Sequence, residues 1–137
     1  RVVEAQHGMM LESGTVFIAP GGTHLRIGEV SLTARRIELT DDPPENYCRP
    51  AVDYTFRSVA SVFGERVLAV ILTGMGRDGT EGLRVLKREP VTVIGQSEES
   101  CTVYGMPREA KLAGLVDDEL PAEKIAAAIM SNLGAAS

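Results

Sequence analysis

The sequence predicts an α/β domain, in which a parallel sheet carries helices on both faces in doubly wound layering and a β-hairpin lies near the start. Three observations predict this fold. From about residue 51 onward, segments with helical spacing of apolar residues alternate with short β-branched runs, which is typical of parallel sheets covered by helices. Residues 67–72 are apolar without interruption, as expected of a strand buried on both faces. The opening of the chain is rich in β patterns instead.

The hairpin is predicted in the first segment, residues 1–46. Residues 15–19 form a β-branched and aromatic run, which a Pro-Gly-Gly turn sequence closes. Residues 25–27 and 31–33 have alternating patterns on either side of Gly28-Glu29, so we expect two paired strands with their turn at that dipeptide. A polar loop broken by two prolines ends the segment.

The second segment, residues 47–137, supplies the helices and the parallel strands. Apolar residues at helical spacing predict a first helix that stops at Gly64. Further helices are expected from Thr80 to Lys87, from Pro107 to Lys111 and from Pro121 onward, with a strand at residues 91–94 between the first two of these. We expect the strand at residues 67–72 to be central in the sheet, with the turn at residues 74–79 at its carboxyl end.

The start of the chain indicates that the domain is incomplete. Val2 and Val3 already read as a strand, and the first residue is Arg1. We therefore expect residues 1–137 to be the C-terminal portion of a single domain, composed of the β-rich segment and the α/β segment.

Composition excludes several classes of function. The net charge is -5, the pI is about 5.0, and aromatic residues make up 4% with no Trp, which argues against nucleic-acid binding. No apolar run approaches the roughly 20 residues that a membrane-spanning helix needs. Cys48 and Cys101 form no CxxC pair, which fits a reducing cytoplasm. His7 and His24 have no nearby Cys or acidic cluster, so we expect no metal and no cofactor.

The most informative stretch is the turn at residues 72–82, where a strand meets a helix, and it has three interpretations. In the first, Asp78 is the N-cap of the following helix and pairs with Glu81 in a capping box. In the second, Asp78 is a catalytic carboxylate that orients a histidine, while backbone N–H groups of the turn form an oxyanion hole. Spacing alone does not decide between them, and one Asp can do both.

The third interpretation is dinucleotide binding in a Rossmann-like half-domain. Gly74, Gly76 and Gly79 match G-x-G-x-x-G, and Glu98 lies near the position of a ribose-binding acid. However, Asp78 would then place a carboxylate beside the pyrophosphate, where positive potential is needed. This fingerprint alone is therefore weak evidence.

Four segments together resemble a known family. They read FIAPGGTHL at residues 17–25, RPAVDYTF at 49–56, LTGMGRDG at 72–79 and SCTVYGMPREA at 100–110. In this order they resemble CheB-type protein-glutamate methylesterases, and the resemblance covers nearly the whole chain. The family hydrolyses glutamate methyl esters on the signalling helices of chemoreceptors, and many members deamidate glutamines there. The resemblance implies this substrate as the partner of the chain.

The resemblance also implies roles for particular residues. The family uses a Ser-His-Asp triad, so Asp78 corresponds to the triad aspartate and the backbone N–H of Met75 to an oxyanion donor. Further residues that the resemblance places at the substrate groove are Arg49, Asp53, Gly74, Gly76 and Met106. Neither the family's nucleophile turn nor its catalytic histidine matches a segment of this sequence, and its N-terminal receiver domain is absent too. We therefore expect the 137 residues alone to be inactive.

Two alternatives remain beside the enzyme. One is a non-catalytic module that binds a receptor or a kinase, and the other is the dinucleotide-binding half-domain. Within the sequence, His24 is interpreted as a structural or groove-lining residue rather than as a replacement base, and Cys101 as a small buried residue rather than as a nucleophile.

Overall fold

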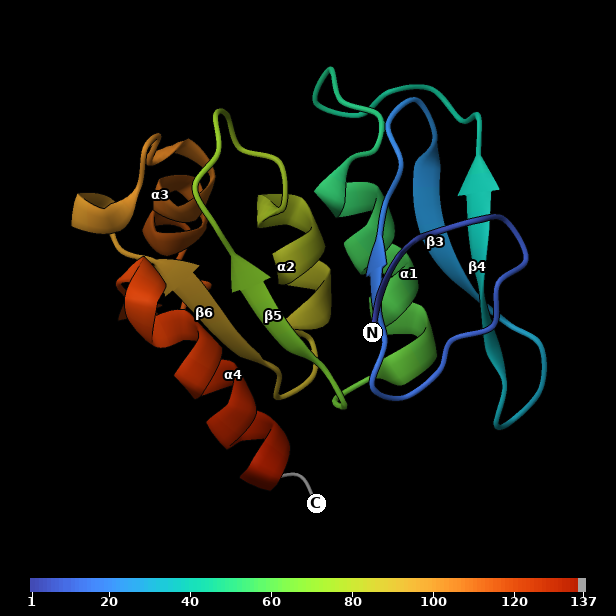
Figure 1. Ribbon diagram of the computed structural model, residues 1–137. Coiled ribbons are helices and arrows are strands. Elements are labelled where there is room, and N and C mark those ends of the chain that lie inside the picture. Colours follow the sequence, from blue (N-terminus) through green and yellow to red (C-terminus); the bar gives the residue numbers. More distant parts are fainter. Residues whose placement is uncertain (136–137) are drawn as a thin grey trace.

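The structure, a computed structural model, describes residues 1–135 and arranges its strands in three small sheets (Figure 1). Two of the sheets are parallel and one is an antiparallel hairpin. The strands, in pairing order, are β1 (Val2–Glu4) with β2 (Val16–Ile18), β3 (His24–Glu29) with β4 (Arg35–Thr40), and β5 (Leu68–Ile71) with β6 (Thr92–Gln96) and β7 (Asp118–Leu120).

Helices cover both faces of the sheet β5-β6-β7, as the sequence predicts. In Figure 1, α4 crosses one face, while α2 and α3 lie on the other and α1 lies between α2 and the hairpin β3-β4. The helices are α1 (Val52–Phe63), α2 (Thr80–Leu86), α3 (Gly105–Leu112) and α4 (Ala122–Ala135), and a 3₁₀ turn spans Glu98–Ser100. The helix boundaries agree with the sequence pattern within two residues.

The main core forms where β5 and β6 meet the helices on one face of the sheet. Its buried members come from β5, α2, β6, α3 and the segments next to them, and they are Ala69, Ile71, Leu83, Leu86, Val91, Val93, Ala110 and Leu115. A smaller cluster, built around Leu25 and Ile37, lies under the hairpin. Helix α1 connects the two regions, because it packs against both α2 and β3.

Local chemistry explains where α1 begins and ends. Its apolar residues recur at helical spacing and face the core. Gly64 has a φ of 59°, which L side chains rarely adopt, and its N–H donates to the Ala60 carbonyl, so the helix stops there.

The hairpin is present, but its predicted turn is wrong. Gly28 and Glu29 belong to β3, where they pair with Arg36 and Arg35, and the chain reverses at residues 30–34. Within this turn, the Ser31 hydroxyl accepts from the Thr33 and Ala34 N–H groups. That side-chain turn replaces the glycine-centred turn that the sequence suggests.

The predicted central position of the strand at residues 67–72 is also wrong for the described strands. β6 is central and β5 lies at the edge. Ala69 and Ile71 are buried, whereas Leu68 and Val70 are only half-buried on the opposite face. The continuous apolar run thus reflects one buried face and one partly open apolar face. No helix within residues 1–135 is both long and apolar enough to cross a membrane.

Candidate active site

The glycine turn lies at the carboxyl end of β5, as predicted, and it is held against the start of α3. The Gly74 N–H donates to the Val103 carbonyl (2.9 Å), and the Gly74 carbonyl accepts from the N–H groups of Gly105 (3.0 Å) and Met106 (2.9 Å). A Cβ at position 74 would stand 2.5 Å from the Met106 sulfur. The Met106 sulfur lies at the end of a flexible side chain and can move, whereas a Cβ at position 105 would stand 2.7 Å from the Gly74 carbonyl oxygen, so it is Gly105 that allows this close approach.

Asp78 is buried, and its carboxylate caps a helix other than its own. Its Oδ2 accepts from the Val52 N–H (2.6 Å), and its Oδ1 accepts from the Asp53 N–H (3.0 Å). Both donors lie in the first turn of α1, where N–H groups lack partners within the helix. The N-cap residue of α2 is Gly79, which has no side chain of its own to cap that helix. The predicted capping box with Glu81 is therefore wrong: Glu81 pairs with Arg84 instead.

Asp53 makes the reciprocal contact. It lies in the first turn of α1, and its Oδ1 accepts from the Gly79 N–H (2.9 Å) and the Gly82 N–H (2.7 Å) at the start of α2. The N-terminus of α1 thus receives the Asp78 carboxylate from the turn before α2, and the N-terminus of α2 receives the Asp53 carboxylate from α1. Negative charge at these positions also complements both helix dipoles. We call this arrangement the reciprocal cap.

Asn46 joins the two carboxylates. Its side-chain amide donates to Asp53 Oδ2 (2.8 Å) and to Asp78 Oδ1 (3.1 Å). No other side chain of the described residues donates to either carboxylate. Sequence reasoning missed this residue, because nothing in a polar, proline-rich loop indicates that it folds over a turn some thirty residues away. The only available signal was that Asn tolerates the left-handed backbone conformation that it adopts here (φ 53°).

The oxyanion candidate Met75 lies at the surface. Its side chain is 83% exposed. Within the part of the chain that the structure describes, neither its N–H nor that of Gly76 donates to a protein acceptor. Gly76 has a φ of 87°, so the turn depends on glycine at this position too. Unpaired N–H groups at a strand end can bind a developing negative charge.

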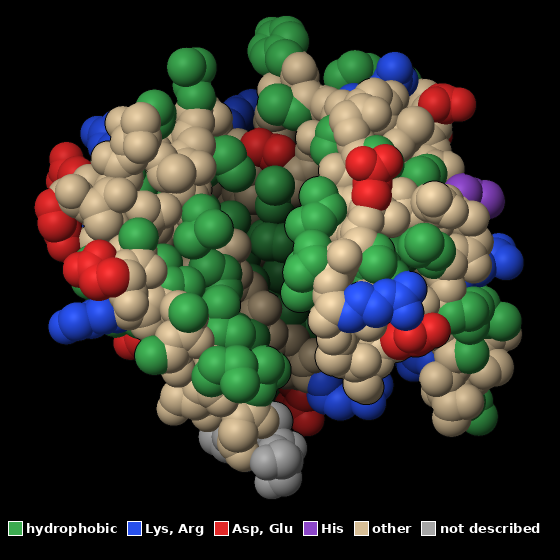
Figure 2. Space-filling model, viewed as in Figure 1, with side chains coloured by type: hydrophobic (Ala, Val, Ile, Leu, Met, Phe, Trp, Pro, Cys, Tyr) green, Lys and Arg blue, Asp and Glu red, His purple; other side chains and the backbone are tan. Residues whose placement is uncertain are grey.

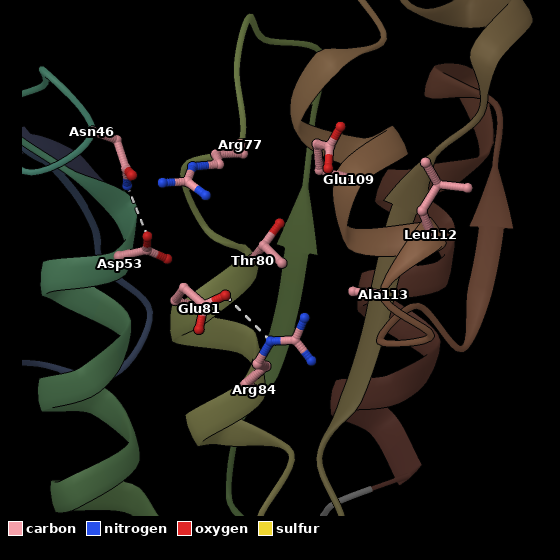
Figure 3. A pocket seen from close by; sticks show the side chains of 9 residues that line it. All are labelled: Asn46, Asp53, Arg77, Thr80, Glu81, Arg84, Glu109, Leu112 and Ala113. Atoms are coloured by element: carbon pink, nitrogen blue, oxygen red, sulfur yellow. Dashed lines mark hydrogen bonds and ion pairs between the residues drawn. The ribbon is translucent and has the colours of Figure 1, made fainter.

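A polar hollow of about 280 Å³ lies beside the reciprocal cap, as Figure 3 shows. Arg77 extends across its upper part toward Asn46, while Glu109 and Leu112 of α3 form the opposite wall. The Arg77 guanidinium makes no ion pair or hydrogen bond with any of residues 1–135. Charges of both signs line this hollow, so charge alone selects no ligand class.

Of the predicted groove residues, only Arg49 lies apart from the turn. Its guanidinium donates to the carbonyls of Asp41 (3.3 Å) and Asp42 (3.4 Å), within its own loop. Asp53 is nearly fully buried at 3% exposure, and both of its oxygens are hydrogen-bonded. The structure thus places Asp53 beside Asp78 and Met106 against Gly74 of the same turn, but it uses Asp53 within the scaffold.

His24 and Cys101, the alternative base and nucleophile, both have structural surroundings. His24 is fully buried, and both ring nitrogens have partners. Cys101 is partly buried, and burial raises the pKa of its thiol, which makes it a poor nucleophile at neutral pH. Among residues 1–135, no group of three or more His, Cys, Asp or Glu is placed to hold a metal ion.

A tyrosine anchors the far side of the turn. The Tyr104 hydroxyl donates to Glu119 Oε2 (2.6 Å), and Glu119 also pairs with Lys111 (3.3 Å). The hydrogen bond to Glu119, with burial, raises the pKa of Tyr104 to about 12. The same bond lowers the pKa of Glu119. Tyr104 forms an isolated bridge with Gly74, so this cluster connects the turn to β7.

Comparison with known proteins decides the family. The family model described as CheB methylesterase matches residues 1–129. The chain belongs to the CheB methylesterase family. The match includes the turn, the reciprocal cap and the hairpin, so these features are parts of one family domain. A dinucleotide fingerprint would account for the glycine turn alone.

Individual curated proteins and one solved structure are also similar to this chain. The chain is 51% identical over 130 residues to a protein-glutamate methylesterase/protein-glutamine glutaminase of Desulfotalea psychrophila, and 43% identical over 135 residues to one of Vibrio cholerae. The two matches cover 94% and 98% of this chain but only 36% of each relative. The crystal structure of the Thermotoga maritima CheB methylesterase catalytic domain matches with a TM-score of 0.85 and 40% identity, over 89% of this chain and 64% of that one. The chain thus spans about a third of the length of these curated relatives.

Proposed function

We propose that this chain is the aspartate-bearing part of a serine-type protein-glutamate methylesterase, in which Asp78 is the triad aspartate. One observation carries the proposal. The two oxygens of a carboxylate offer about four acceptor positions, and three of those on Asp78 are taken by Val52, Asp53 and Asn46. The remaining position, on Oδ2, can accept the Nδ1–H of a histidine.

The proposed reaction is hydrolysis of a glutamate methyl ester. A serine hydroxyl attacks the ester carbonyl carbon while a histidine takes its proton, and Asp78 stabilises the imidazolium that forms. The negative charge on the carbonyl oxygen is stabilised by the Met75 N–H, which is free to donate. Methanol then leaves with the proton from the histidine, and water hydrolyses the acyl-enzyme by the same steps.

The serine and the histidine are proposed to come from the part of the family domain that lies beyond these residues. This chain matches 64% of the Thermotoga catalytic domain, so about a third of that domain has no counterpart here. We therefore expect the 137 residues alone to be inactive, because triad members act as a unit. The substrates are methylated glutamates on chemoreceptor signalling helices, and deamidation of glutamine would follow the same acyl-enzyme path. A receiver domain is the proposed regulatory partner, and the cytoplasm the location.

The test is Asp78→Asn in the complete catalytic domain that contains this chain. An amide presents a donor where the histidine needs an acceptor, so turnover should fall by about 10³- to 10⁴-fold. Stability should also fall, by about 1–3 kcal/mol, because the new N–H₂ group faces donors from α1 or Asn46. Turnover should therefore be expressed per folded molecule.

The matched control is Asp118→Asn, which makes the same chemical change on the exposed strand β7 and should leave turnover unchanged. Asp78→Asn with most of its turnover retained would mean that Asp78 only caps α1. A complete domain that binds methylated receptor without hydrolysing it would favour the non-catalytic module.

A further inference from the structure

We propose that Asn46 is a positioning residue for the reaction: its side-chain amide fixes the orientation of the Asp78 carboxylate and directs the histidine to Oδ2. The inference rests on the proposed function and adds a residue to it.

The geometry around the carboxylate shows what Asn46 contributes. The α1 N-terminus provides one backbone donor to each oxygen, Val52 N–H to Oδ2 and Asp53 N–H to Oδ1. With these two alone, each oxygen would keep one open acceptor position. The Asn46 amide fills the one on Oδ1. Counting the donors among residues 1–135, the one open position is then on Oδ2, so a histidine can approach the carboxylate in one way.

The second hydrogen bond of Asn46 addresses a like-charge problem. Asp53 and Asp78 are only 3% and 6% exposed, and both receive a hydrogen from the same amide group. Two buried carboxylates that share a site repel each other. A donor between them offsets that repulsion and fixes the separation of the two groups. Asn46 therefore acts on Asp78 directly and also through Asp53.

The loop that carries Asn46 is built to hold it. Glu45 and Cys48 exchange two backbone hydrogen bonds (3.0 and 2.8 Å) around Asn46 and Tyr47, and Glu45 also pairs with Arg57 of α1. Both enclosed residues adopt positive φ, 53° for Asn46 and 62° for Tyr47. This conformation is costly for a side chain as large as Tyr, and it persists only where the surroundings maintain it. The Asn46 amide is thus presented from a constrained backbone.

The adjacent residue supplies a matched control. The Tyr47 side chain is fully exposed, and it makes no hydrogen bond with the other described residues. Glycine adopts positive φ without strain, so Asn46→Gly and Tyr47→Gly are both compatible with this backbone conformation. They differ in that only Asn46→Gly removes a contact with Asp78.

The experiment measures kcat, KM and the melting temperature of both variants in the complete catalytic domain, with a methylated receptor as substrate. For Asn46→Gly we expect kcat per folded molecule to fall by about 10- to 100-fold, as for small misplacements of a catalytic group. KM should stay near its original value, because the Asn46 amide is engaged by the carboxylates of Asp53 and Asp78. Tyr47→Gly should match the parent. The imidazole Nδ1–H proton resonance, which reports the His–Asp78 hydrogen bond, should weaken or shift in Asn46→Gly alone.

Three results would overturn the inference. They are equal kcat in the two variants, a rise in KM without a fall in kcat, and a lower melting temperature with an unchanged kcat and Nδ1–H resonance. The last would make Asn46 a purely structural cross-link. A parent domain without turnover, or an Asp78→Asn variant that keeps it, would instead contradict the proposed function itself.

Discussion

The buried histidine at position 24 shows how a titratable side chain can serve the scaffold alone. The Ala51 N–H donates to Nδ1 (3.2 Å), so the ring proton lies on Nε2, which donates to the Pro43 carbonyl (2.9 Å). The ring also stacks on Tyr54 with a centroid separation of 4.1 Å. His24 thereby ties β3 to the loop before α1, the loop that also carries Asn46.

Replacing His24 by Leu should therefore destabilise the protein substantially. The change leaves a buried N–H at Ala51 and a carbonyl at Pro43 without partners, at a cost of about 2–4 kcal/mol in the free energy of unfolding. Urea denaturation would measure it. His7→Ala is the comparison: His7 is exposed and accepts only the Leu39 N–H, which water can replace, so its loss should stay under about 1 kcal/mol. Equal losses for the two histidines would contradict the scaffold role of His24.

Tyr104 should make the stability of the protein dependent on pH at the alkaline end. Its pKa in the folded state is about 12, above the value of about 10 for an unfolded chain. The folded state therefore favours the protonated phenol, and this contribution is complete below pH 10 and is lost as pH rises toward 12. The difference in unfolding free energy between the parent and Tyr104→Phe should be constant near neutral pH and shrink above pH 10. A difference that stays constant up to pH 12 would show that the Glu119 hydrogen bond does not discriminate between the two forms.

At the scale of elements, α1 and α2 approach each other closely at Gly82. A Cβ there would lie 2.6 Å from Phe56 Cβ and 3.2 Å from Asp53 Cα. Both are atoms at or next to the backbone, so the helix rather than a flexible side chain would have to move. The Gly82 N–H also donates to Asp53, and a shift of α2 would therefore disturb the reciprocal cap.

We expect Gly82→Ala to lower the free energy of unfolding by about 1–3 kcal/mol through overpacking, although Ala is the better helix former. Thermal or urea unfolding would test this. The control is Gly134→Ala in α4, where the added Cβ meets no atom of the described residues within 4 Å and the effect should be neutral or slightly stabilising. A Gly82→Ala variant as stable as the parent would indicate that the helices separate at little cost.

The elements themselves were predictable, and their partners were less so. Helix spacing, Gly64 and the apolar runs predict α1, α2, β5 and β6 from local chemistry alone. The sequence cannot report which helix Asp78 caps, because a carboxylate before α2 looks like an N-cap of α2 wherever its side chain points. The hairpin turn was missed for a similar reason: Gly28-Glu29 is a good turn sequence, but the pairing of β3 with β4 extends through it.

At the scale of the whole molecule, the sheet β1-β2 and the edge strand β5 each bury one face and leave the other open. β2 packs Phe17 against the hairpin cluster, while Val16 and Ile18 point the other way and are 54% and 52% exposed. β5 likewise buries Ala69 and Ile71 and leaves Leu68 and Val70 half-exposed. Figure 2 shows hydrophobic side chains lining a hollow between the two sheets on this side of the molecule. We call this area the open apolar face.

The open apolar face should make the purified 137-residue chain associate with itself. An exposed apolar area next to unpaired strand edges favours contact between molecules, so sedimentation should give a mass above the 14.7 kDa of one chain. Ile18→Lys should shift the distribution toward the monomer. Leu32→Lys introduces the same charge at an isolated position in the hairpin turn, which is 95% exposed, and should change nothing. A parent chain that is monomeric at every concentration tested would contradict this prediction.

The reciprocal cap makes the first turn of each helix dependent on the other. If the start of α1 opens, Asp78 loses its backbone donors, and the Asp53 carboxylate leaves the N–H groups of Gly79 and Gly82 unpaired. If α2 opens first, the Asp53 carboxylate loses its donors at Gly79 and Gly82, and Asp78 moves away from the start of α1. The two helices should therefore open in a single cooperative event rather than fray separately. An inherited substitution in either helix would then change both the folding cooperativity and the positioning of the Asp78 carboxylate. Selection on the position of this carboxylate would therefore also constrain folding cooperativity.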